Sequence, residues 1–202
     1  MAIEILGGYG DGYIAASNNF YLYQNLSSDQ YTYIAADLDL CLGNTVKNIS
    51  NMLSGDYSTF PGWDNKPLVN QMMRVPEFNQ KFKQTLQDLN TKLFNNNATN
   101  SRIDDLAIML KEDVEWDQKL TKDLYKKFLE SLGISQSSDI FTSPQFAPVF
   151  KDPAQLDMAK RMFDGVPFNT AINGPTGHIT LSGIKEWFRV IHQNTANFFL
   201  QK

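Results

Sequence analysis

The 202-residue chain contains very little cysteine and histidine, and this scarcity excludes several kinds of site. Cys41 is the single cysteine, so an internal disulfide cannot form and a cysteine-rich metal centre is excluded. We expect nearby acidic residues to disfavour its thiolate. Neither His178 nor His192 has a second histidine or cysteine beside it, which argues against a zinc site. We expect His178 to be a solvated loop residue and His192 a partly buried structural residue.

Strong charge imbalance and long apolar runs are also missing. The net charge is −4 and there is no basic stripe, so we do not expect nucleic-acid binding. No apolar stretch approaches the roughly 18 to 20 residues that cross a bilayer, which argues against a transmembrane segment. Residues 1–6 lack the charged-then-apolar layout of a signal peptide.

The composition is that of a folded domain, with 42% hydrophobic and 20% charged residues. We expect one domain over residues 1–202, of mostly helical α+β class. Two runs rich in aromatic residues, Phe20 to Tyr23 and Tyr31 to Ala35, predict a small β-hairpin held together by aromatic packing. This hairpin lies within a region, residues 1–43, that contains most of the polar residues suited to chemistry.

The remainder of the chain has mainly helical periodicity. Over residues 66–202, apolar side chains recur at helical spacing in stripes that begin at Phe78, Ile103, Leu120 and Ile184. We expect Ser101 and Ser182 to cap two of these helices. Residues 44–65 contain glycine and proline, and residues 135–153 are rich in serine and proline, so we expect both segments to be mainly loop.

An aspartate, an asparagine and a second aspartate around the hairpin could converge on one metal-bound phosphate. Phosphoryl transfer needs one carboxylate to accept the proton of the attacking hydroxyl, and oxygen ligands for magnesium. Asp11 suits the first role, Asp37 that of metal carboxylate, and Asn18 or Asn19 that of neutral metal ligand. Asp39 should share a strand face with Asp37 because side chains alternate, so it could support the metal or hold the following loop.

The same residues resemble the CotH family of spore-coat kinase-like proteins, whose fungal members include surface invasins of Mucorales moulds. Three blocks carry the resemblance: Leu6-Gly7-Gly8-Tyr9-Gly10-Asp11-Gly12-Tyr13, Asn18-Asn19-Phe20-Tyr21-Leu22-Tyr23, and Asp37-Leu38-Asp39 with Gly43. Weaker similarity continues to the Ser182-Gly183-Ile184-Lys185-Glu186-Trp187 segment. The resemblance therefore spans nearly the whole chain.

The resemblance implies the large lobe of an atypical protein kinase that phosphorylates serine on secreted coat proteins. Asp11 matches the catalytic aspartate and Asp37 the metal-binding aspartate, with Mg²⁺ or Mn²⁺ and ATP as cofactors. Asn18 or Asn19 matches the metal-binding asparagine. The implied location is extracellular, at a cell surface or spore coat.

One departure from the family is large. Family members have a small lobe before the catalytic block, with a lysine that grips the nucleotide, and we expect that lobe to be absent here. Lys47 and Lys66 follow Asp37 and do not take that place. We therefore expect a C-terminal lobe that is inactive by itself. The alternative is a surface adhesin or invasin that binds a host-cell receptor without catalysis.

Overall fold

The computed structural model describes residues 1–134, 136–142 and 150–201. Its elements follow one another in the order α1 (Ala2–Gly7), α2 (Tyr13–Ala16), β1 (Phe20–Asn25), β2 (Gln30–Ala35), η1 (Ile49–Asn51), η2 (Tyr57–Thr59), η3 (Trp63–Asn65), α3 (Pro67–Arg74), α4 (Pro76–Lys92), α5 (Asn96–Ser131), α6 (Ser137–Thr142), α7 (Pro153–Asp164), α8 (Phe168–Asn173) and α9 (Ile184–Leu200). Helices dominate and β1 pairs with β2 in a two-stranded sheet, which confirms the predicted mostly helical α+β class.

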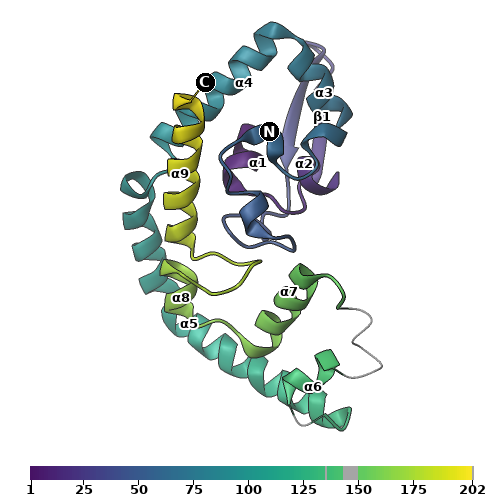
Figure 1. The fold of residues 1–202 in the computed structure, drawn as a ribbon, viewed down its shortest axis with the longest axis vertical. Helices are drawn as coiled ribbons and strands as arrows, with labels where there is room; N and C mark the ends of the chain where they lie inside the picture. The colour runs from purple at the N-terminus through teal and green to yellow at the C-terminus, as the bar shows by residue number, and fades with distance from the viewer. Residues whose placement is uncertain (135, 143–149, 202) are drawn as a thin grey trace.

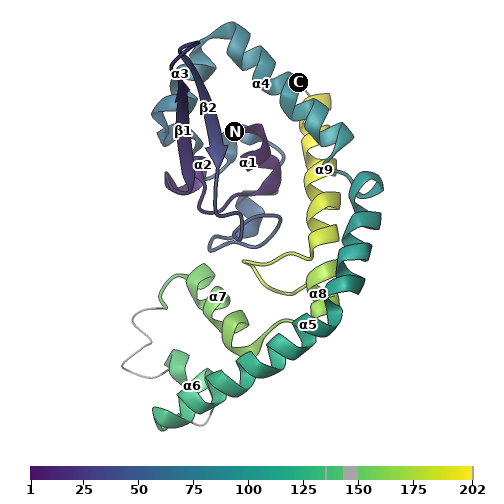
Figure 2. The same cartoon turned by 180° about the vertical axis from the view of Figure 1, so that it is seen from behind.

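The elements form a curved body (Figures 1 and 2). The hairpin lies with α1, α2 and α3 at one end, and α4 passes over that end to reach α9. Helix α5 extends beside α8 and α9 toward the other end, where α6 and α7 lie. No helix in the described part of the chain is both long and apolar enough to cross a membrane.

The core lies where α9 packs against α1 and α4. Its largest fully buried side chain is Trp187 of α9, which is 0% exposed and whose Nε1 donates a hydrogen bond to the Leu6 carbonyl at 2.9 Å. Other fully buried side chains gather around it from distant parts of the sequence, namely Leu6, Ile14, Met52, Val69, Leu86 and Ile191. The N-terminal segment and the C-terminal helix therefore share one core.

The hairpin is confirmed, but its aromatic packing is only partly as predicted. The strands are antiparallel, with Phe20 opposite Ala35. Phe20 stacks on Tyr33 with ring centroids 5.8 Å apart, so these two residues do pack. Tyr21 and Tyr31 are 66% and 63% exposed, so the expected packing is wrong for them. They lie on opposite faces of the hairpin, since Tyr21 is opposite Ile34, whereas Tyr31 is opposite Gln24 on the face that also carries Phe20 and Tyr33.

Helix α5 replaces two predicted helices with one. It begins at Asn96 rather than after Ser101, and the Asn95 side chain caps it by accepting a hydrogen bond from the Ala98 N–H at 2.9 Å. It continues to Ser131 because no glycine or proline interrupts residues 96–131. The predicted cap at Ser101 is therefore wrong, since that residue lies inside the helix.

Smaller corrections concern the loops and a second cap. Residues 44–65 are mainly irregular, as predicted, with three short 3₁₀ turns. The predicted loop over 135–153 contains helix α6, whereas residues 143–149 lie outside the described ranges. Ser182 does not cap α9, because its hydroxyl donates to the Gly183 carbonyl and leaves the N-terminal amides of that helix uncapped.

Candidate active site

Backbone hydrogen bonds bring three separate segments together at the base of the hairpin. The Gly10 N–H donates to the Leu40 carbonyl at 2.9 Å, which joins the glycine-rich loop to the residues after β2. The Ala36 N–H donates to the Asn19 carbonyl at 2.9 Å, which extends the hairpin pairing by one residue pair. Asp11, Asn19 and residues 37–39 are thus neighbours in space, although they are separated along the chain.

Gly10 is glycine because this junction is tight. A Cβ atom at Gly10 would lie 2.1 Å from the Thr45 Oγ1 atom, far inside van der Waals contact. The residue that follows is Asp11, so this close approach also determines where its carboxylate lies. We name residues 37–44 the acidic loop, because they contain Asp37 and Asp39 and close this junction on its other side.

Asn19 contacts the predicted catalytic carboxylate directly. Its Nδ2 donates to the Asp11 Oδ2 at 2.6 Å. The described residues provide no hydrogen-bond donor for the side-chain oxygen of Asn19, Oδ1, so that oxygen is available to a ligand. Asn18 is exposed, and within the same described ranges its side chain forms no hydrogen bond. Of the two asparagines that the sequence left open, Asn19 is the one placed beside Asp11.

The acidic loop acts on Asp11 through charge. Burial raises the pKa of Asp11, and the like charges of Asp39 and then Asp37 raise it further, against the opposing hydrogen bond from Asn19. In the described part of the chain, no lysine or arginine forms an ion pair with these three carboxylates. The junction is therefore an acidic region without a cation of its own.

The expected strand alternation of Asp37 and Asp39 is wrong. Strand β2 ends at Ala35, and Asp37 has a left-handed φ of 52°, so neither residue belongs to the strand. Both carboxylates are exposed at the turn that follows. The predicted effect on Cys41 is confirmed, because burial and the charges of Asp39 and Asp11 raise the pKa of its thiol to about 11.

Because the pKa of Asp11 is raised in the folded protein, replacing this aspartate by a neutral residue should stabilise the fold at neutral pH. A carboxyl whose pKa is higher in the folded state contributes stability below its unfolded pKa, near 3.9, and loses it as the pH rises through the folded value. In metal-free buffer, Asp11→Asn should therefore raise the melting temperature at pH 7 by about 1 to 3 °C, a small effect because of solvent screening.

Thermal unfolding at pH 7 and pH 3 tests this expectation. At pH 3 the gain should vanish, because Asp11 is then protonated in both states. Asp123→Asn is the matched control, since Asp123 is exposed on α5 and should change stability little at either pH. A lower melting temperature of Asp11→Asn at pH 7, or an equal gain at both values, would contradict the electrostatic account.

The negative charge of the acidic junction suits a divalent cation, but its side chains do not form a complete set of metal ligands. No group of three or more histidine, cysteine, aspartate or glutamate side chains within the described ranges is placed to hold a metal by itself. Magnesium often binds through one or two carboxylates and takes its other ligands from water and substrate phosphates. Asp37, Asp39 and the side-chain Oδ1 of Asn19 are the groups here that could supply protein ligands.

Sequence reasoning missed a buried carboxylate directly beneath the site. Glu4 of α1 is 1% exposed, and its Oε2 accepts a hydrogen bond from the Ile14 N–H at 3.0 Å. Its Oε1 accepts a short hydrogen bond from the Tyr33 hydroxyl on β2. Burial and the Glu4 carboxylate raise the pKa of Tyr33, so the phenol remains a donor. Glu4 therefore joins α1, α2 and the hairpin.

The structure confirms the expectation for one histidine and contradicts it for the other. The Nδ1 of His192 lies 3.0 Å from the Asn90 carbonyl, which confirms a structural role in α9. The expectation that His178 is simply solvated is wrong, because its Nδ1 lies 2.8 Å from the Asp157 Oδ1. This contact depends on α7 lying against the 178–182 segment, which the sequence around His178 does not reveal.

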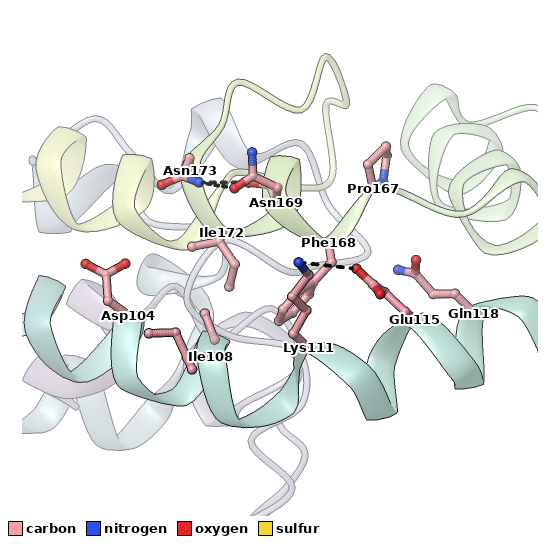
Figure 3. Close-up of a pocket in the computed structure, with 11 residues that line it drawn as sticks. Asp104, Ile108, Lys111, Glu115, Gln118, Pro167, Phe168, Asn169, Ile172 and Asn173 are labelled. Carbon is pink, nitrogen blue, oxygen red and sulfur yellow. Dashed lines mark hydrogen bonds and ion pairs between the residues drawn. The ribbon is translucent and has the colours of Figure 1, made fainter.

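A separate pocket of about 620 Å³ lies between α5 and α8 (Figure 3). Ile108, Phe168 and Ile172 supply its apolar wall, and the Lys111 Nζ lies 3.9 Å from the Glu115 Oε1 at its edge. None of the residues that line it is one of the predicted site residues. This pocket is therefore distinct from the junction around Asp11.

Comparison with known protein families gives a match over the region that contains the acidic junction. The family model described as CotH kinase protein matches residues 1–138, which include Asp11, Asn19 and the acidic loop. No curated protein matches the chain. No solved structure matches it either. Because the family model covers more than half of the sequence, the chain belongs to the CotH kinase protein family.

Proposed function

We propose that the junction around Asp11 is the phosphoryl-transfer site of a CotH-like atypical protein kinase that acts on protein serine. The observation that carries the proposal is the junction itself. It places a carboxylate of raised pKa, an amide bonded to that carboxylate and two further carboxylates together, within the matched family region. Such groups suit phosphoryl transfer, which depends on positioning and on charge stabilisation more than on covalent chemistry.

In this proposal each residue has a separate task. Asp11 accepts the proton of the attacking serine hydroxyl, and its raised pKa makes it a better base than an ordinary aspartate. Asn19 orients Asp11 through its side-chain Nδ2 and offers its side-chain Oδ1 to the metal. Asp37, with Asp39 beside it, would hold Mg²⁺ or Mn²⁺ of the nucleotide complex. A bound divalent cation would neutralise charge on the phosphates of ATP.

We also propose that the 202-residue polypeptide alone transfers phosphate slowly or not at all. Phosphoryl transfer requires positive charge around the phosphates. Within the described ranges, no ion pair brings a lysine or arginine to Asp11, Asp37 or Asp39. Substrates would be coat or cell-surface proteins, because the CotH family is a family of spore-coat proteins, and the protein would act at that location.

Nucleotide binding by the 202-residue chain tests the proposal. At ten times the dissociation constant, Mg·ADP should stabilise the fold by about 1.4 kcal/mol and raise the melting temperature by roughly 3 to 5 °C. Asp37→Asn should abolish this shift, whereas the control Asp123→Asn should retain it. Transfer of labelled phosphate from ATP to a serine peptide should remain near background.

Two results would contradict this proposal in different ways. Absence of any Mg·ADP shift in the wild-type protein would overturn the phosphoryl-transfer site. Robust, Asp37-dependent transfer of labelled phosphate would keep the site but overturn the proposed inactivity of the polypeptide.

A second proposal, a surface adhesin or invasin that binds a host-cell receptor, is favoured by the exposed hairpin. Tyr21 and Tyr23 share one face of the hairpin and Leu26 lies at its turn; these side chains are between 60% and 87% exposed, and apolar side chains gathered on one surface are typical of binding sites. In this case Asp37→Asn should leave binding to host cells unchanged, whereas Tyr21→Ser with Leu26→Ser should weaken it.

A further inference from the structure

Arg161 of helix α7 contacts the acidic loop. The Arg161 Nη2 donates to the Asn44 Oδ1 at 2.7 Å and to the Thr45 carbonyl at 3.1 Å, while its Nε donates to the Thr180 Oγ1 at 3.0 Å. Asn44 is the last residue of the acidic loop. One guanidinium therefore joins α7, the acidic loop and the segment before α9.

Asn44 transmits this contact to the acidic residues. While its Oδ1 accepts from Arg161, its Nδ2 donates to the Asp39 carbonyl at 2.9 Å. Both ends of the amide are thus engaged, which fixes its orientation. The backbone at Asp39 is held by a side chain that Arg161 in turn holds.

The segment before α9 is bonded to the same stretch of chain. The Ser182 N–H donates to the Gly43 carbonyl at 2.8 Å, and the Thr45 N–H donates to the Thr180 carbonyl at 3.0 Å. Asn44 and Leu181 form an antiparallel bridge between these hydrogen bonds. The C-terminal end of the acidic loop is therefore paired along its backbone as well as contacted by Arg161.

Asp157, one turn before Arg161 on α7, fixes the other side of this network. Its Oδ2 accepts from the Thr180 N–H at 2.9 Å and from the Thr180 hydroxyl at 2.7 Å, and its Oδ1 lies 2.8 Å from the His178 Nδ1. Burial alone would raise the pKa of Asp157, but these hydrogen bonds outweigh it and hold the pKa below its usual range. The carboxylate is ionised at neutral pH and supports the charge of the partly buried Arg161.

We propose that Arg161, supported by Asp157, is a positioning residue that holds Asp37 and Asp39 of the acidic loop in place beside Asp11. This inference rests on the proposed function, because it assigns Arg161 a task toward the same metal-bound nucleotide. It goes beyond the family match, which ends at residue 138, whereas α7 begins at Pro153. Arg161 acts through Asn44 and does not itself contact the reacting atoms.

The single cysteine offers a local reporter that is independent of nucleotide binding. Cys41 lies inside the acidic loop, is only partly exposed, and its thiol donates a hydrogen bond to the Leu38 carbonyl at 2.8 Å. Because this contact and the surrounding loop limit access to the sulfur, alkylation should be slow in the wild-type protein at pH 8. If Arg161→Ala releases the loop, exposure of Cys41 should accelerate alkylation by iodoacetamide at least about tenfold.

Two further variants separate positioning from general destabilisation. Arg161→Lys keeps the charge but lacks the planar guanidinium that donates to three separate acceptors at once. It should therefore give a rate of Cys41 alkylation between those of the wild-type protein and Arg161→Ala. Arg189→Ala is the matched control, since the Arg189 side chain is 60% exposed on α9 and its ion pair with Glu186 is long, at 4.0 Å. Circular dichroism at the assay temperature should show that every variant remains folded.

The nucleotide readout uses Mg·ADP on the same variants. Arg161→Ala should lose at least half of the Mg·ADP melting-temperature shift, and Arg161→Lys should lose less. Unchanged Cys41 alkylation in both Arg161 variants would overturn the inference, whatever the protein binds. A faster alkylation with an undiminished Mg·ADP shift would also overturn it, since the loop would then be held without effect on the site. If the wild-type protein shows no shift at all, the proposed function fails separately, and the alkylation rates still decide whether Arg161 holds the loop.

Discussion

Replacement of Trp187 by alanine is expected to lower the free energy of unfolding by about 3 to 5 kcal/mol. The indole is 0% exposed and its Nε1 donates to the Leu6 carbonyl, so the change creates a cavity and leaves a buried acceptor unpaired. The Gly8 backbone packs directly on the indole, because a Cβ atom at Gly8 would lie 2.4 Å from it. Glycine has no side chain that could move into the cavity, so the cavity should remain largely unfilled. Thermal unfolding followed by circular dichroism should show a melting temperature lower by roughly 10 °C or more.

Trp116 provides a control with the same chemical change. It lies on α5 and is 67% exposed, so Trp116→Ala should change the free energy of unfolding by no more than about 0.5 kcal/mol. Equal melting temperatures for the two variants would contradict the position of α9 in the core, because they would mean that Trp187 is not packed against α1.

Replacement of Glu4 by alanine should have the second largest effect, about 2 to 3 kcal/mol of destabilisation. The variant removes the only described acceptor of two donors, the Ile14 N–H and the Tyr33 hydroxyl. Both donors lie in or beside the core, and unpaired buried donors are costly. A melting temperature lower by roughly 5 to 10 °C is expected, together with faster amide hydrogen exchange in β2.

Glu4→Gln and Glu112→Ala test the cause. Glutamine keeps an oxygen acceptor in nearly the same place, so Glu4→Gln should recover much of the lost stability. Glu112 is exposed on α5, so Glu112→Ala should have almost no effect. If Glu4→Gln were as destabilising as Glu4→Ala, the loss would come from the charge of Glu4 rather than from its hydrogen bonds.

Local patterns in the sequence predicted the hairpin and the long helices because their causes are local. Aromatic strand residues flank a polar turn, and Pro76 stands where α4 begins. The two-helix interpretation of residues 101–132 was wrong because polar residues around Trp116 resembled a boundary. Without glycine or proline, such residues simply continue α5 along its exposed side.

The sequence could predict which residue types form the candidate site and their order along the chain, but not their arrangement in space. The sequence indicated Asp11, Asp37 and an asparagine, but the placement of Asn19 against Asp11 depends on the hairpin register and its backbone pairing with Ala36. Glu4 gave no signal, because one acidic residue among apolar ones usually marks an exposed helix face. The contacts of Arg161 join residues more than a hundred positions apart, which no local pattern can reveal.

The shared core of α1 and α9 has a practical consequence for dissecting this protein. A fragment of residues 1–138, the range that the family model matches, would keep every acidic side chain of the junction. It would lose the Trp187 indole, which packs against Leu6. Such a fragment should expose apolar surface and aggregate rather than fold. We therefore expect the smallest part of the chain that folds by itself to be longer than the range that the family model matches.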